Sequence, residues 1–515
     1  MTDQGFFRRR PREHDVEPSV AAEFKSTKRR FSPGVLLLGL GVVMLATGAK
    51  LILIQRYGTD QPYADQWAAV GMYFLRGPLY YKINLTQITS LHGEHRPALT
   101  RLWVRGLILA NEGQWDCYVE LVADLLIYAG YLFVVWRWLI SLVEGRWLIP
   151  AAVCFTVLFG LPCAYENFLW GFQSQFLFLL LLGTLHICGT LHETRVGLRW
   201  WLAQVAGFLG IFSIAAGAMS AAALALVAGL ELMRGRRNPW AWSTLIVNVM
   251  LFGLGFWLVP NVTPEGTLLA RLFQAVRGTG YLLSWPFAAP GWCLLLQAPW
   301  VILLFNGWWK RDEAHGKGDR LVGVTGLWVL TMAFAIAYGR DLTSENIGVR
   351  YYDVLVLGLF INVPALIRIS TRQNSRWRFV WRGLASVWLV AIAAGLWHHN
   401  QPEALRNMFN FQHDLAIEQQ GVVRDFMISN DPAKLQEFEK KSQRFPHFQI
   451  TLEFLRDPKV PALLPPSLTP DHHQNQLSRL ARRIAGDWPA LIVVGLLAGL
   501  AGAICLIRRV KLNSS

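Results

Sequence analysis

The amino-acid sequence predicts an all-α polytopic membrane protein with about twelve transmembrane helices. Of its 515 residues, 53% are hydrophobic and only 16% are charged, a balance that excludes most soluble and disordered chains. Apolar runs of about 17–25 residues recur along the whole chain, which is the length a helix needs to cross a bilayer. The basic residues, finally, are concentrated on alternate connecting segments.

The apolar runs define the predicted helices in order. The first run follows a basic region, but it is too long for a cleaved signal peptide and continues past Lys50, so we interpret it as a retained anchor. The predicted spans are 34–55, 117–139, 147–163, 173–191, 199–215, 217–233, 240–259, 288–307, 321–338, 351–368, 379–397 and 488–507.

Charge predicts the orientation. Segments on the N-terminal side of the membrane hold 27 Lys and Arg against 10 Asp and Glu. Cytoplasmic loops carry such an excess, so the basic tail 1–33 and the C-terminal tail 508–515 are both predicted to be cytoplasmic. This distribution accounts for the net charge of +15 and excludes nucleic acid as a partner.

The predicted domains are a bundle and two external segments. Residues 34–397 form a bundle of about eleven helices, with a first external loop at 56–116. Residues 398–487 form an external segment of mostly short helices, ending in an extended Pro-rich stretch at 458–470, before the last span at 488–507.

Two acidic residues, Asp60 and Asp65, lie in the first external loop. A carboxylate at the membrane surface can accept a proton from a hydroxyl nucleophile, and the alternative is an ordinary solvated loop. The loop also contains the sequence HGEHR, followed by an amphipathic stretch, 97–110, suited to lie in the membrane interface.

The HGEHR sequence contains His92, Glu94, His95 and Arg96. On a helix, His92 and His95 would share one face and suggest a metal site, but the spacing is not HExxH and a third ligand is not evident. We therefore expect no cofactor; a divalent metal is the less favoured alternative. Acid–base chemistry, hydrogen bonding to sugar hydroxyls, or a structural network are the other interpretations.

Residues 164–176, AYENFLWGFQSQF, follow the third span. On a helix, Glu166, Trp170 and Gln173 would lie on one face. A carboxylate, an amide and an aromatic ring suit a sugar, and an interfacial aromatic belt is the alternative.

A late external loop, 338–353, contains Arg340, Arg350 and Tyr351. Arginine on the outer side opposes the positive-inside trend, and a guanidinium there can bind a lipid phosphate through two hydrogen bonds. The alternative is an ion pair with a neighbouring acid: Asp341, Glu345 or Asp353.

Together these features resemble the GT-C superfamily, multispan glycosyltransferases that use polyprenyl-phosphate-linked sugars, and particularly a bacterial branch of it. The resemblance covers most of the chain as architecture and rests on Asp60 and Asp65, the interfacial stretch, Arg350–Tyr351 and the short motifs HGEHR, ENFLWGFQSQF and GR…VRYY. The chain departs from the family pattern because Gln follows each Asp in place of a second acid, and no WWD signature is present.

The resemblance implies an inverting transferase in the bacterial cytoplasmic membrane. Asp65, or Asp60, would act as the base, and Arg350 with Arg340 would bind the donor phosphate. His92, Glu94, His95 and Trp170 would position the sugar or the glycan or lipid acceptor. A transporter or flippase of lipid-linked glycans is the main alternative, and a glycan polymerase is another. The absence of an internal sequence repeat favours the enzyme over the transporter.

Overall fold

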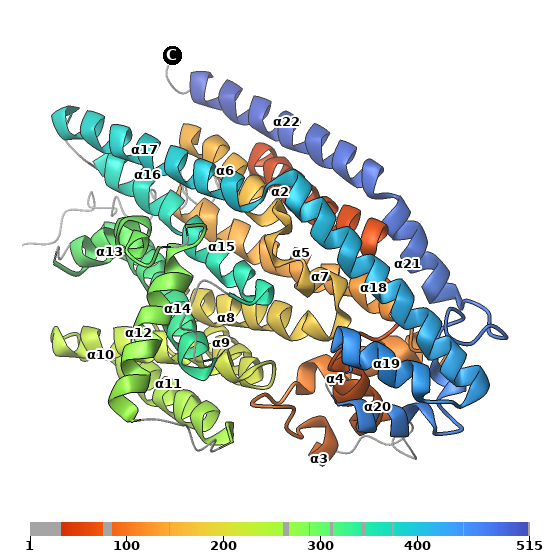
Figure 1. Cartoon of the computed structure of the whole chain (residues 1–515). Helices are drawn as coiled ribbons and strands as arrows, with labels where there is room; N and C mark the ends of the chain where they lie inside the picture. The colour runs from red at the N-terminus through yellow and green to blue at the C-terminus, as the bar shows by residue number, and fades with distance from the viewer. Residues whose placement is uncertain are drawn as a thin grey trace, which may run out of the picture.

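The computed structural model describes residues 32–75, 85–143, 145–260, 267–287, 289–309, 313–340, 347–372, 375–445 and 447–512. Within these ranges the chain is helical, and its one β feature is an isolated bridge between His92 and His95. Figure 1 shows long helices packed side by side, with several shorter helices gathered at one end. The predicted all-α class is therefore confirmed, whereas residues 1–31 of the predicted N-terminal tail, 1–33, lie outside the described residues.

Ten helical segments of the described chain are long and apolar enough to cross a membrane. This supports a multi-pass membrane protein, and ten of the twelve predicted spans correspond to helical segments of sufficient length and apolarity. The main helices of these segments are α2 (Pro33–Tyr57), α5 (Cys117–Leu142), α6 (Leu148–Gly160), α8 (Ser174–His192), α10 (Met219–Met233), α11 (Pro239–Leu258), α14 (Glu313–Gly339), α15 (Tyr352–Phe360) leading into α16 (Asn362–Arg372), α17 (Ser375–His399) and α22 (Trp488–Leu512).

The two other predicted spans are helices that fall short of this length. The predicted 199–215 is α9 (Leu198–Ile211), and the predicted 288–307 is α13 (Trp292–Trp309), of which Trp292–Asn306 is the apolar part. Fourteen residues in α9 span only about 21 Å. A further helix, α12 (Leu268–Ser284), packs against α14 and was not predicted, because its apolar residues form only one face.

The predicted external segment, 398–487, contains mostly short helices, as predicted, together with one long helix. Helix α18 (Pro402–Ser429) has 28 residues and ends at Asn430, which adopts a left-handed conformation. The Pro-rich stretch 458–470 forms turns and one short 3₁₀ helix instead of the predicted extended chain. The remaining helices are α19 (Ala433–Ser442), α20 (Phe448–Leu455), η8 (Pro461–Leu463) and α21 (Gln476–Gly486).

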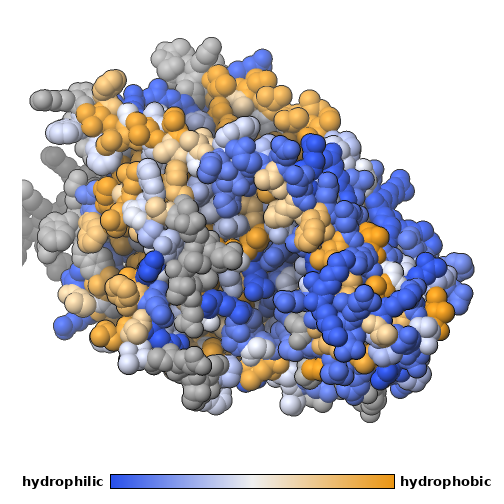
Figure 2. All heavy atoms as spheres, in the orientation of Figure 1, coloured by the Kyte–Doolittle hydropathy of each residue, from blue (hydrophilic) through white to orange (hydrophobic). Residues whose placement is uncertain are grey.

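This segment packs on the first external loop, so that the two form one body. A single hydrophobic cluster joins Trp67 and Trp115 of the loop to Phe445 and Phe454 of the segment. Figure 2 shows hydrophilic residues gathered over α18 and α19, at the right of the view, and hydrophobic residues over the upper and left parts. The elements of the loop are η1 (Trp67–Leu75), α3 (Leu85–Ile88) and α4 (Ala98–Ala110), which confirms a helix in the predicted amphipathic stretch.

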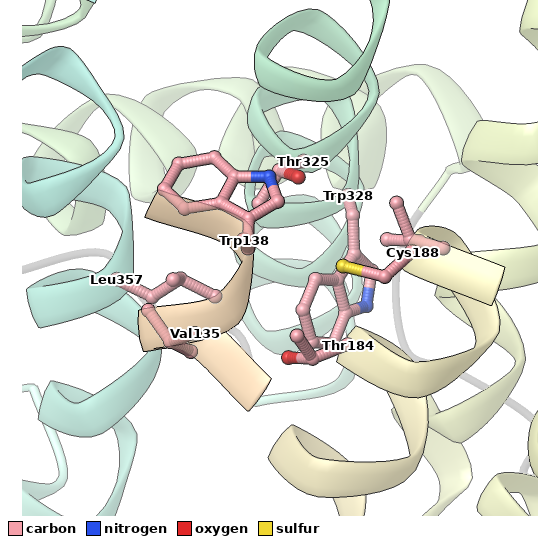
Figure 3. Close-up of a pocket in the computed structure, with 8 residues that line it drawn as sticks. Val135, Trp138, Thr184, Cys188, Thr325, Trp328 and Leu357 are labelled. Carbon is pink, nitrogen blue, oxygen red and sulfur yellow. The ribbon is translucent and has the colours of Figure 1, made fainter. Parts of the chain in front are cut away.

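The membrane helices are closely packed. Between α5, α8, α14 and α15 lies a mostly apolar cavity of about 10 Å³, lined by residues that include Trp138 and Trp328 (Figure 3). That volume holds about one water molecule. The polar residues of interest lie elsewhere, at the end of the bundle that carries α18–α21.

Glycines bring the first and last spans, α2 and α22, into direct backbone contact. A Cβ atom on Gly41 would lie 2.5 Å from the backbone nitrogen of Gly499. Small residues allow such close approach, which is a principal source of helix association in lipid. Helix α22 also continues to Leu512, so that the predicted tail from 508 begins as helix.

We expect Gly41→Leu to destabilise the protein by about 1–3 kcal/mol, because the added side chain must push α22 away. Gly253→Leu is the matched control, since a Cβ there would meet no atom within 4 Å. Thermal unfolding of both variants in detergent is the measurement. Equal melting temperatures for the two variants would contradict the assigned role of this contact.

Candidate functional site

The structure places Asp60 and Asp65 in different networks. The Ser467 hydroxyl donates to Oδ1 of Asp60 at 2.6 Å, and Nη2 of Arg482 lies 3.0 Å from Oδ2. Arg482 also contacts Asp116 at 2.8 Å. Burial raises the pKa of Asp60, against the effects of Ser467 and Arg482. Because both of its oxygens have partners, Asp60 fastens α21 to the first loop.

We expect Arg482→Gln to loosen the C-terminal segment, because two largely buried carboxylates, Asp60 and Asp116, would lose their cation. Charged hydrogen bonds of this kind contribute about 1.5–3 kcal/mol each, less where solvent reaches them. Limited proteolysis should cleave residues 398–487 faster in this variant. The exposed neighbour Arg483 gives the control Arg483→Gln, and equal cleavage rates would refute the assignment.

Asp65 faces His92, His447 and Arg350 instead. It precedes η1, and its Oδ2 lies 3.7 Å from Nε2 of His92. Burial alone raises the pKa of Asp65, but the contact with His92 and the electrostatic effects of His447 and Arg350 outweigh it, so that the net shift is downward. Its side chain is 33% exposed. Asp65 is therefore an ionised carboxylate that a ligand can reach.

The HGEHR sequence forms a tight turn and not the helix considered from the sequence. The backbone groups of His92 and His95 exchange two hydrogen bonds, of 2.8 and 3.0 Å, and Gly93 adopts φ +55°. Burial lowers the pKa of His95 to about 4, although Glu94 opposes the shift. Its Nδ1 accepts a hydrogen bond from Ala215 N–H, so the neutral ring carries its proton on Nε2.

Arg340, at the end of α14, contacts this turn. Its Nη2 lies 2.5 Å from Oε1 of Glu94, and its Nε donates to the Tyr351 hydroxyl at 3.1 Å. The same Glu94 oxygen lies 3.4 Å from Nε2 of His95. The first loop and the loop after α14 thus meet through Glu94.

Arg350 has no carboxylate partner within the ranges that the structure describes. Of the predicted alternatives, Asp341 and Glu345 lie outside those ranges, and Asp353 accepts a hydrogen bond from Asn167. The guanidinium lies over the Tyr351 ring, 5.6 Å from its centre. It is partly buried and acts electrostatically on both Asp65 and Glu166.

Glu166, Trp170 and Gln173 do not share a helix face, contrary to the expectation. Helix α7 (Glu166–Leu169) ends before Trp170, which is extended, and the 3₁₀ helix η5 (Gly171–Gln173) follows. The Trp170 ring is buried against Tyr63, with 5.1 Å between ring centres, and is not an open platform. Gln173 is also buried. Glu166, by contrast, is partly exposed and lies in the field of Arg350.

Two functional candidates, Arg444 and His447, were missed from the sequence. Both belong to the C-terminal segment, and no local motif marked them. Arg444 lies over the Tyr63 ring at 4.1 Å and donates to Gln412, while its Nη1 is buried with no partner among the described residues. His447 packs against His92, with 6.1 Å between ring centres.

Arg96 has a structural role, and the described residues do not form a metal site. Arg96 donates to the carbonyls of Thr89 and Leu258, which ties the first loop to the end of α11. Among the described residues, no group of three or more His, Cys, Asp or Glu side chains is placed to hold a metal ion.

The site therefore combines an ionised acid, Asp65, with Arg340 and Arg350 from the segment between α14 and α15 and with Arg444 from the C-terminal segment. Such an arrangement is able to bind an anionic ligand beside a general base. No protein-family model matches the sequence, and no curated protein shows significant similarity to it.

Proposed function

We propose that this protein is a membrane glycosyltransferase of the GT-C type. It transfers a sugar from a polyprenyl-phosphate donor to a glycan or lipid acceptor of the cell envelope, with inversion. The observation that carries the proposal is the placement of ionised Asp65 within the field of Arg350, an arginine that no described carboxylate neutralises.

The proposed reaction needs one base and one phosphate site. The acceptor hydroxyl oxygen attacks the anomeric carbon and gives its proton to Asp65. The bond from that carbon to the phosphate oxygen breaks, and polyprenyl phosphate leaves with the electron pair. Arg350 and Arg340 stabilise the charge that develops on this phosphate. Asp65 then releases the proton to water.

The surrounding residues take supporting roles. His92 holds the Asp65 carboxylate, and the Glu94–His95 turn orients Arg340 through the 2.5 Å contact. Glu166 is placed to accept hydrogen bonds from sugar hydroxyls, while Trp170 packs against the Tyr63 ring and holds it in position. Gln173 supports the loop from its buried position.

The proposed membrane rests on the resemblance to the GT-C superfamily, and the proposed orientation rests on the charge distribution. We propose that the chain lies in a bacterial cytoplasmic membrane, with both termini in the cytoplasm and α18–α21 outside. The bound partners would be the lipid-linked donor, the acceptor and membrane lipids. The excess of Lys and Arg on the N-terminal side supports this orientation.

Mass spectrometry of envelope glycans and lipid-linked sugars in a deletion strain tests the proposal. We expect one sugar to be missing and its polyprenyl-phosphate form to accumulate, with rescue by wild type but not by Asp65→Asn. Accumulation of complete lipid-linked glycans on the inner leaflet would instead favour a flippase. Accumulation of unpolymerised diphosphate-linked repeat units would favour a polymerase.

A further inference from the structure

A polar cavity lies at the opposite end of the bundle from Asp65. Helix α8 begins beside Gln173 and ends at His192, next to this cavity. The cavity has a volume of about 480 Å³, which is within the range of about 300–1,000 Å³ common for ligand sites. It is formed where α8 and α10 end and where α11 and α14 begin.

Basic side chains dominate its wall. Two acids are present, but each has a cation of its own: Glu231 lies 3.1 Å from Arg236 and 3.8 Å from Arg320, and Glu193 lies 3.8 Å from Arg199. Two further cations, Arg237 and Lys317, line the cavity without a carboxylate partner among the described residues. The cavity therefore carries an excess of positive charge, which suits an anion.

Part of the lining is apolar. Leu191 and Trp240 line the cavity, and Trp240 is buried in a small cluster with Trp200. Beside it, Trp201 and Trp242 are about half exposed, at 53% and 48%. Tryptophan of this kind typically lies at the level of lipid headgroups, so that acyl chains can lie along the surface next to the cationic wall.

We propose that this cavity binds the headgroup phosphate of an anionic phospholipid, with Arg237 and Lys317 as the principal cations. The combination of free cations with exposed tryptophan favours a lipid over a small soluble anion, which would make no use of the apolar surface. The proposal does not depend on the transfer reaction, because it concerns the other end of the bundle.

Native mass spectrometry of the full-length protein, delipidated and titrated with dioleoyl phosphatidylglycerol, tests whether the cavity binds an anionic phospholipid. We expect the Arg237→Gln/Lys317→Gln variant to bind on the order of tenfold more weakly, from the contribution of two basic residues near anionic lipid. Arg237→Lys/Lys317→Arg should keep the affinity, which separates lost charge from misfolding.

The control is Arg508→Gln/Arg509→Gln, which removes the same charge from exposed residues of α22 outside the cavity. It should bind as wild type does, and phosphatidylcholine should bind none of the proteins tightly. Equal loss in both double-Gln variants would show general surface attraction and overturn the proposal. Displacement of the lipid by millimolar inorganic phosphate would overturn it too, by identifying a site for free anions.

Discussion

Asp65→Asn should reduce the rate of sugar transfer by about 10²–10⁴-fold, which is the usual contribution of a general base. The amide cannot accept the hydroxyl proton, yet it has nearly the same size and leaves the contacts of the loop intact. Transfer of radiolabelled sugar by purified protein in liposomes is the measurement. The wild-type rate should be flat near neutral pH and should fall in acid, as the carboxylate with its lowered pKa becomes protonated.

Asp60→Asn is the discriminating comparison, because the two acids lie in the same loop. Asp60 is already bound by Ser467 and Arg482. We therefore expect a lower melting temperature but a transfer rate per folded molecule within about threefold of wild type, well short of the loss of a base. If the effects of the two substitutions are reversed, Asp60 is the base and the present assignment fails.

Arg350→Gln should reduce transfer by about 10²–10³-fold, as the loss of one preorganised stabilising donor does in other enzymes. The glutamine side chain retains hydrogen-bonding groups but not the charge that the leaving phosphate requires. Because the charge on the phosphate grows as the bond breaks, kcat should fall more than the affinity for the donor. Steady-state kinetics with varied donor concentration measure both effects.

Arg424→Gln serves as the control for Arg350→Gln. Arg424 is exposed on α18, and its substitution removes the same charge from the same end of the protein. It should leave kcat unchanged. A loss of kcat in Arg424→Gln as large as that in Arg350→Gln would mean that general surface charge matters and that Arg350 makes no specific contribution.

The sequence predicted helices well where burial in lipid leaves a continuous apolar run. It failed at α12, where Arg271 and Gln274 interrupt the apolar residues, and it overestimated the lengths of α9 and α13. The length of α18 was also missed, because its buried residues are spaced widely along one face and resemble those of an amphipathic segment of any length.

The site was predicted less completely than the helices. Asp65 was identified as a carboxylate that follows the first predicted span, Glu94 by the HGEHR sequence, and Arg340 and Arg350 because they oppose the predicted charge trend. The structure places Glu94 in contact with Arg340, and Asp65 in the field of Arg350. Arg444 carries no such signal, because one arginine in a charged external segment is ordinary. Its significance comes only from tertiary packing, which buries the guanidinium against Tyr63.

Two glycines in the sequence indicated that the backbone does not continue as a helix. Gly93 in HGEH and Gly171 after Trp170 are both typical of chain reversals or helix breaks, and the structure has a turn at the first and a helix end before the second. The expected helix faces at these positions were therefore wrong, although the residues themselves remain candidates.

Release of free polyprenyl phosphate tests the central claim most directly. Lipid-linked sugars and the acceptor fraction, both extracted from the deletion strain, would be incubated with purified protein in liposomes, and the products identified by mass spectrometry. Wild type should convert one polyprenyl-phosphate sugar to polyprenyl phosphate, and Asp65→Asn should leave that lipid intact. Equal release by the two proteins, or none by wild type in the presence of the acceptor fraction, would contradict the proposed transferase.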